Sequence, residues 1–167
     1  MIRLALSLTV LASFTAQAND VIKITSAEVV EYGIYRTAAE ARVVAPGTSS
    51  GELTLLAEPR LVRATQTVPA LLHSSFGIRY RLEGAPIGAV LEIRDVIKTP
   101  GLTPDDGETT FVEERADIAR VGETHYLGYT FEEAWERVPG KWTFEVWYRD
   151  QLLLAQEFDV VKMRLQH

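Results

Sequence analysis

Few side chains in this sequence are suited to metal or nucleophilic chemistry, and those few lie far apart. The chain has no cysteine and three histidines, His73, His125 and His167. It contains no HExxH motif, no pair of histidines at metal-ligand spacing and no thiolate. We therefore expect no metal site, no cofactor and no cysteine nucleophile.

Two short segments resemble reactive loops without matching one. Gly47–Gly51 (GTSSG) lacks the GxSxG elbow of a serine nucleophile, so we expect a flexible loop. Asp105–Glu108 (DDGE) could offer oxygen ligands to calcium, but it lacks the ligand spacing of an EF-hand. Pro104–Gly107 is instead typical of a turn.

The acidic residues leave one enzymatic hypothesis open. The chain has 23 Asp and Glu against 17 Lys and Arg, a net charge of −6. That balance argues against nucleic-acid binding, which needs clustered basic residues. A glycosidase-like pair of carboxylates could still assemble in the fold, because such a pair is defined by space and not by sequence.

Trp147 is the residue most suited to contact a partner. It alternates with Trp142, Phe144 and Val146, so it shares the outer face of its strand with Glu145 and Arg149. An exposed tryptophan there would anchor a protein or a glycan. In the alternative interpretation, Trp147 packs against Leu153 or a loop, since large aromatic side chains are usually buried.

The elements that must position these residues are almost all β-strands. Phe76, Ile78, Tyr80 and Leu82 alternate with polar or small residues, as in a half-buried antiparallel strand. Similar segments recur at short intervals with turn residues between them. The pattern predicts an all-β fold, an antiparallel immunoglobulin-like β-sandwich of about eight strands. The segments that we expect as strands are 21–35, 52–58, 61–68, 76–82, 90–97, 109–118, 124–129, 142–148 and 152–160.

Two local features are specific enough to predict in detail. Thr130 and Glu133 have the spacing of a capping box, which predicts one short helical turn over Phe131–Val138. A three-residue connection, Arg149–Gln151, would pair Tyr148 with Leu152 and Val146 with Leu154. We prefer it to a two-residue connection, because a shift of one residue would bring acidic residues opposite Phe144 and Trp142.

Three motifs in order carry a family resemblance. They are Glu31–Tyr35 (EYGIY), Phe76–Tyr80 (FGIRY) and Pro139–Phe144 (PGKWTF). With these motifs the chain resembles the bacterial family catalogued as domain of unknown function 3859. The resemblance covers most of residues 19–167 and implies a small secreted β domain. It implies no catalytic residues.

The first eighteen residues predict export. Arg3 precedes an apolar run, Leu4–Phe14, and Ala16-Gln17-Ala18 has the small-x-small pattern of a cleavage site. We expect a signal peptide over 1–18, cleaved after Ala18, and a single domain over 19–167, in the periplasm or secreted. Eleven apolar residues are too few to cross a bilayer, since about 20 are needed, so we expect no stable membrane insertion.

Three functions remain to be distinguished. The sequence favours a non-catalytic module that binds a protein or glycan of the cell envelope, with Glu145, Trp147 and Arg149 as its candidate contact residues. Such a module would show an exposed aromatic patch or an open edge strand. A small hydrolase would show clustered acids with shifted pKa values in a cleft. A carrier of apolar ligands would show an apolar pocket.

Overall fold

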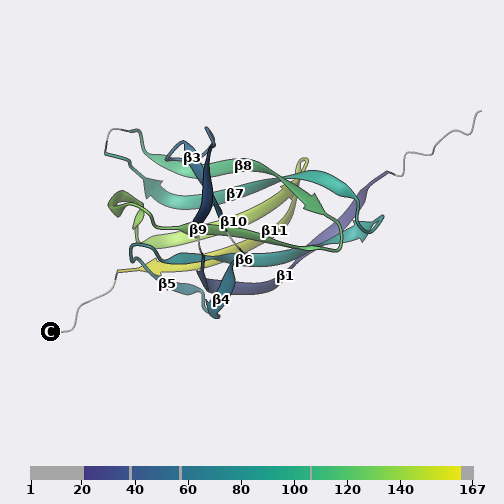
Figure 1. Cartoon of the computed structure of the whole chain (residues 1–167), viewed down its shortest axis with the longest axis horizontal. Helices are drawn as coiled ribbons and strands as arrows, with labels where there is room; N and C mark the ends of the chain where they lie inside the picture. Colours follow the sequence, from purple (N-terminus) through teal and green to yellow (C-terminus); the bar gives the residue numbers. More distant parts are fainter. Residues whose placement is uncertain (1–20, 38, 57, 106, 163–167) are drawn as a thin grey trace, which may run out of the picture.

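Two antiparallel sheets pack face to face in the computed structural model, which describes residues 21–37, 39–56, 58–105 and 107–162 (Figure 1). The first sheet has the strand order β4-β1-β6-β9. Its strands are β1 (Lys23–Arg36), β4 (Arg60–Arg63), β6 (Ser75–Ala85) and β9 (Thr124–Thr130). The expected all-β sandwich is therefore confirmed.

The second sheet has five strands in the order β5-β11-β10-β7-β8. They are β5 (Thr67–Pro69), β7 (Val90–Leu102), β8 (Thr110–Arg120), β10 (Gly140–Tyr148) and β11 (Gln151–Val161). All neighbours are antiparallel except β5 and β11, which run parallel. β8 ends this sheet and β9 ends the first, and a turn joins these two edge strands in sequence.

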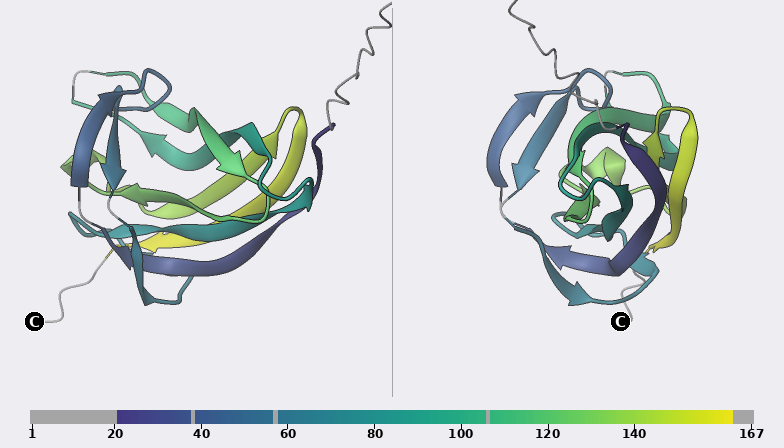
Figure 2. Two further views of the ribbon diagram at one scale, coloured as in Figure 1. Left: turned by 45° about the vertical axis from the view of Figure 1, so that its right-hand side comes forward. Right: turned by 90° about the vertical axis from the view of Figure 1, so that its right-hand side faces the viewer.

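A separate hairpin, β2 (Ala39–Val44) and β3 (Glu52–Leu56), forms its own two-stranded sheet. It stands across one end of the sandwich, where it spans the gap between the two main sheets (Figure 2). A two-stranded sheet is marginally stable alone, so its position depends on contacts that its loop makes with the rest of the fold.

The core is centred on Phe76 of β6. Its ring lies 5.3–5.5 Å, centroid to centroid, from the rings of Phe131, Trp142, Phe144 and Phe158. All five side chains are buried, as are Ile78, Tyr80 and Leu82. The predicted alternation of β6 and β10 is therefore confirmed, since every second residue enters the space between the sheets.

The described residues form eleven strands where the sequence suggested about eight. The segment Leu61–Val68 is split between β4 and β5, which lie in different sheets. β7 continues to Leu102 through the expected loop at Thr99, and Gly101 adopts a φ of +120° that side chains rarely tolerate. The strand β2 has no counterpart in our sequence-based prediction.

The connection between β10 and β11 is shorter than expected, and one of the predicted core-facing residues changes with it. Tyr148 pairs with Gln151 across a two-residue turn, so the predicted Tyr148–Leu152 pair is wrong. A bulge at Leu153 then shifts the register, and Val146 pairs with Leu154 as predicted. Leu154, Phe158 and Val160 thus remain on the inner side, but Leu153 packs against the core in place of Leu152, which is 43% exposed.

The expected helical turn begins three residues later than predicted. It is a 3-10 turn, η1 (Ala134–Glu136), capped by Glu133 rather than Thr130. The capping box is formed by Glu133 and Glu136, while the Thr130 hydroxyl pairs with Ser75 at 2.7 Å. A hydroxyl engaged across the sheet is not available to cap a helix.

The expected signal peptide, residues 1–18, and His167 lie outside the described residues. Within the described part of the chain, no helix is long and apolar enough to cross a membrane.

Candidate functional site

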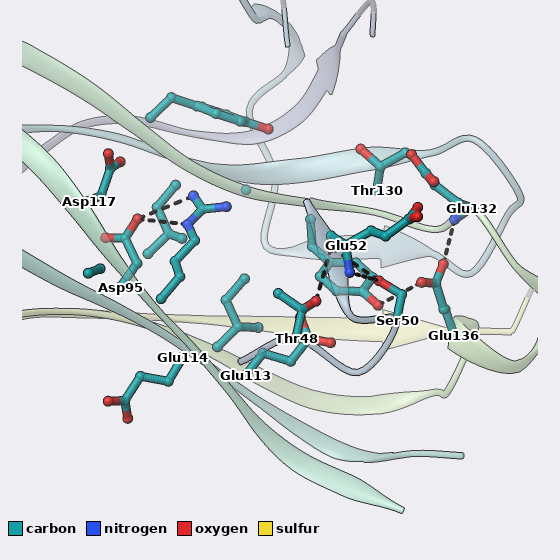
Figure 3. A pocket seen from close by; sticks show the side chains of 17 residues that line it. Thr48, Ser50, Glu52, Asp95, Glu113, Glu114, Asp117, Thr130, Glu132 and Glu136 are labelled. Carbon is teal, nitrogen blue, oxygen red and sulfur yellow. Dashed lines mark hydrogen bonds and ion pairs between the residues drawn. The ribbon is translucent and has the colours of Figure 1, made fainter. Parts of the chain in front are cut away.

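A cleft of about 260 Å³ opens between the edge strands β8 and β9, beneath the β2–β3 hairpin (Figure 3). Its floor includes the apolar side chains Ile97 and Leu127, and Tyr126 and Tyr129 line it from β9. Seven carboxylates also line it: Glu52, Asp95, Glu113, Glu114, Asp117, Glu132 and Glu136. Arg115 is the one basic residue among the described residues that line it.

The strand β8 brings charge into the space between the sheets. Glu113 and Arg115 lie opposite Ile97 and Asp95 of β7, on the face that points towards the core. The outward positions of β8 instead hold exposed apolar residues, Val112 at 45% and Ile118 at 62%. This strand is therefore inverted relative to an ordinary sandwich strand.

Asp95 is the most deeply buried carboxylate of the cleft, with 2% of the residue exposed. Its Oδ2 accepts hydrogen bonds from Arg115 Nη2 at 3.2 Å and Arg115 Nε at 3.3 Å. Burial raises the pKa of Asp95 to about 6, because desolvation penalises its charged form and Asp117 adds negative charge, although Arg115 opposes the shift. Its Oδ1 has no hydrogen bond of good geometry among the described residues, but the buried hydroxyl of Tyr80 lies close enough to Asp95 to favour its charged form.

Glu136, the last residue of η1, forms the wall of the cleft opposite Asp95. Its Oε2 accepts hydrogen bonds from the backbone N–H groups of Glu132 and Glu133, at 2.5 Å and 2.9 Å. The hydroxyl of Tyr129 donates to Oε1 at 3.0 Å. Burial raises the pKa of this carboxyl, although the three donors favour its charged form. The side chain therefore fixes η1 against β9.

The loop of the hairpin, residues 45–51, covers the cleft. We expected a flexible loop, but hydrogen bonds attach it to β8. Ser49 donates to Glu113 Oε1 through its backbone N–H, at 2.9 Å, and through its hydroxyl. Gly47 O accepts from Glu114 N at 3.1 Å. A Cβ at Gly47 would lie 2.1 Å from the Glu114 carbonyl oxygen, so only glycine allows this approach. The GTSSG segment thus docks on β8.

Arg42 attaches the other side of the hairpin. Its guanidinium lies 3.0 Å from Glu132 and 3.7 Å from Glu52. The hairpin therefore connects β8, in one sheet, with the segment that follows β9 in the other.

Negative charge in the cleft exceeds the positive charge that neutralises it. Glu114 pairs with Arg94 at 3.3 Å, and Asp95, Glu52 and Glu132 are paired as described above. Glu113, Asp117 and Glu136 form no ion pair with another described residue. No group of three or more His, Asp or Glu in the described ranges has the arrangement of a metal site.

The predicted contact surface at Trp147 lies elsewhere, on the outer face of β10. Trp147 is half-buried: Arg94 stacks over its ring at 5.2 Å, and its indole N–H donates to Glu145 at 2.9 Å. Glu145 is itself buried and accepts from Lys98 at 2.6 Å. Arg149 is exposed and stacks on Tyr148 at 5.1 Å. The structure thus brings Glu145 and Trp147 into contact.

The remaining candidates have local roles. His73 has a φ of 62°, and its N–H donates to Phe131 O. The His125 ring contacts the backbone of Arg120. Gly107 N donates to Pro104 O at 3.1 Å, which closes the predicted turn. None of these residues lines the cleft.

The architecture defines an immunoglobulin-like β-sandwich. A solved immunoglobulin-like protein from Pseudomonas aeruginosa is similar, with a TM-score of 0.58 and 26% identity over 82% of this chain and 98% of that one. The family model for the domain of unknown function DUF3859 matches residues 23–160, so the chain belongs to that family. No curated protein matches the chain.

Our reading of the sequence missed the cleft because its residues come from five separate elements and none forms a motif. One signal was present. In Thr110–Arg120, alternation places either Glu113, Arg115 and Asp117 or Val112 and Ile118 on the inner face, and the pattern alone does not decide which set points inwards.

Proposed function

We propose that this protein is a non-catalytic binding module that acts outside the cytoplasm and takes its ligand in the cleft between β8 and β9. One observation carries the proposal. A cleft of about 260 Å³ opens between two edge strands of the sandwich, and the described residues that line it include seven carboxylates and one basic side chain, Arg115. Three of these carboxylates, Glu113, Asp117 and Glu136, form no ion pair with another described residue, so the cleft offers negative charge to a ligand.

The arrangement of the acids favours binding over catalysis. Each carboxylate with a raised pKa also holds the fold together: Asp95 pairs with Arg115, and Glu136 fixes η1. A general acid must instead reach the bond that is broken. The walls are also too acidic for a carrier of apolar ligands.

A small hydrolase is the second candidate, because the cleft contains clustered acids and the pKa of Asp95 is raised to about 6. Those are features of a catalytic carboxyl group. Turnover of a cleft-bound ligand by the native protein, absent in Asp95→Asn, would establish this alternative.

The Trp147 surface supports a second contact of the module with a protein or glycan. Arg94 covers one face of the ring and Glu145 holds its N–H, so Trp147 is fixed in orientation. A rigid aromatic side chain loses little entropy on binding.

Export rests on Arg3, the apolar run and Ala16-Gln17-Ala18. N-terminal sequencing of the protein from its own cells should begin at Asn19. An intact Met1 on protein from the cytoplasm would refute export.

Site-specific photo-crosslinking tests the binding site. A benzophenone amino acid is placed at Ser50, which is exposed and lines the cleft, at Arg149 beside Trp147, and at Val62 as a control. Each variant is irradiated in envelope extract, and its mass is then measured by intact-protein mass spectrometry. We expect an adduct from Ser50 that excess unlabelled protein abolishes, and none from Val62.

Other outcomes would contradict binding in the cleft. An adduct from Arg149 alone would move the binding site to the Trp147 surface. No adduct from Ser50, or equal adducts at all three positions, would refute binding in the cleft.

A further inference from the structure

The charge and the lining of the cleft indicate what it binds. In the described chain, Glu113, Asp117 and Glu136 face it without an ion-pair partner, and Asp95 Oδ1 has no hydrogen bond of good geometry, although the Tyr80 hydroxyl lies close to Asp95. Tyr126, which also lines the cleft, has a buried hydroxyl without a hydrogen-bond partner. An anionic ligand would be repelled here, and a neutral one would leave the excess charge uncompensated.

The shape of the cleft restricts the ligand further. Its volume of about 260 Å³ lies below the range of roughly 300–1,000 Å³ that is typical of pockets for drug-sized molecules. Its apolar floor, Ile97 and Leu127, and the rings of Tyr126 and Tyr129 suit a chain of methylene groups. A slender apolar stem with a charged end fits such a mixture.

The protein itself places one cation in this cleft. Arg115 contributes a guanidinium group to Asp95 Oδ2 through two hydrogen bonds. In the described residues, the acidic side chains have no arrangement suited to a metal ion. An organic cation with an apolar stem would contact both the carboxylates and the apolar floor of the cleft, which a metal ion would not.

We infer that the cleft binds an alkylammonium group, a primary ammonium on a flexible methylene chain, with Asp117, Glu113 and Asp95 as its carboxylate partners. The inference rests on the proposed function and names its ligand class. Such a group comes from a free polyamine or from a lysine side chain of a protein. In both cases the stem lies over Ile97 and Leu127, and the ammonium replaces water around the carboxylates.

Calorimetric titration of the mature protein tests this inference. The probes are cadaverine, spermidine and the peptide acetyl-Gly-Lys-Gly-amide, and the same peptide with an acetylated lysine is the neutral control. We expect the charged probes to bind and the acetylated peptide not to bind. Binding of the peptide alone assigns the group to a protein partner, and binding of the free amines alone assigns it to a polyamine.

Two matched variants connect binding to the cleft. Asp117→Asn removes one exposed carboxylate of the cleft, and Asp150→Asn removes an exposed carboxylate at the β10–β11 turn. Asp117→Asn should weaken binding about five- to tenfold, as expected for a partly solvated ion pair, while Asp150→Asn should not. Folding of both variants is verified by circular dichroism.

Equal binding to both variants would overturn the inference, because the cations would then associate with the surface in general. Failure of every charged probe, while the Ser50 crosslink still captures a ligand, would overturn the ligand class and leave the proposed function standing. Failure of both experiments would refute both proposals.

Discussion

The centre of the sandwich and its open side, between β8 and β9, have the same strand geometry but place different kinds of side chain on the inner face. At the centre, Phe76, Trp142 and Phe144 point inwards and form a dry aromatic core. On the open side, the inward residues of β8 are Glu113 and Arg115, and a hairpin covers them. A central strand must present apolar groups on its inner face, whereas an edge strand can bring charges inside because solvent and polar groups of the covering loop lie close by.

Inward-pointing charges also protect an edge strand from pairing with a second chain. β8 therefore has a structural role and a proposed binding role at once. The following experiments separate the two regions, beginning with the largest expected effect.

Phe144→Ala should lower the free energy of unfolding by about 3–5 kcal/mol, because it removes buried surface and leaves a cavity beside Phe76. Chemical denaturation measures the loss. Leu152→Ala, at a residue that is 43% exposed on the partner strand, serves as the control and should cost under about 1 kcal/mol. Equal losses would mean that the faces of the C-terminal hairpin are assigned incorrectly.

Asp95 should make the protein less stable as pH rises, whereas a carboxylate with a lowered pKa has the opposite effect. Its pKa is raised to about 6 in the fold, so the folded state binds more protons than the unfolded chain between about pH 4 and 6. The contribution of Asp95 to stability is therefore most favourable at low pH and declines as pH rises through 6. Relative to Asp95→Asn, the native protein should lose on the order of 2 kcal/mol between pH 4 and 7.

Denaturation of both proteins across this range measures that difference. Parallel pH profiles would show that the pKa of Asp95 is the same in the folded and unfolded chain. The buried carboxylate of the cleft would then not differ electrostatically from an exposed one.

Gly47→Ala should release the roof of the cleft while leaving the core intact. Its Cβ would overlap the Glu114 carbonyl oxygen, so the loop must move away from β8. We expect a loss of about 1–2 kcal/mol and faster hydrogen exchange at the Glu114 amide, which donates to Gly47. Ser50→Ala, in the same loop, is the control. An unchanged exchange rate at Glu114 would contradict the docking of the loop.

Trp147→Ala should have the smallest effect, about 1 kcal/mol, because the ring is half-buried and its contacts are with Arg94 and Glu145. Denaturation measures the cost, and binding to an envelope partner should decrease by more than stability does. A loss as large as that of Phe144→Ala would identify Trp147 as part of the core.

The sequence predicted the centre of the molecule better than its open side, for a physical reason. Along β6 and β10, apolar and polar residues alternate without conflict, so Phe76 and Phe144 could be assigned to the core. Along β8, Val112 and Ile118 compete with Glu113 and Arg115 for the inner face. That competition is decided by Asp95 and by the loop at Ser49, which are distant in sequence.

Sequence reasoning also failed where a partner outside the segment determined the local structure. Thr130 could have capped a helix, but Ser75 engages its hydroxyl. The Gly47–Gly51 loop has the composition of a flexible segment, but Glu113 and Glu114 hold it. Neither contact follows from the pattern of residues around the segment.

The bulge at Leu153 has a consequence for how this hairpin can vary. Seven residues, 147–153, separate Val146 from Leu154, however they are divided between turn and bulge. A two-residue turn with a bulge and a three-residue turn without one both place Leu154 opposite Val146, but with the bulge Leu153 and not Leu152 packs against the core. The loss of one residue from this segment could therefore be absorbed by the loss of the bulge, because a regular two-residue turn also places Leu154 opposite Val146.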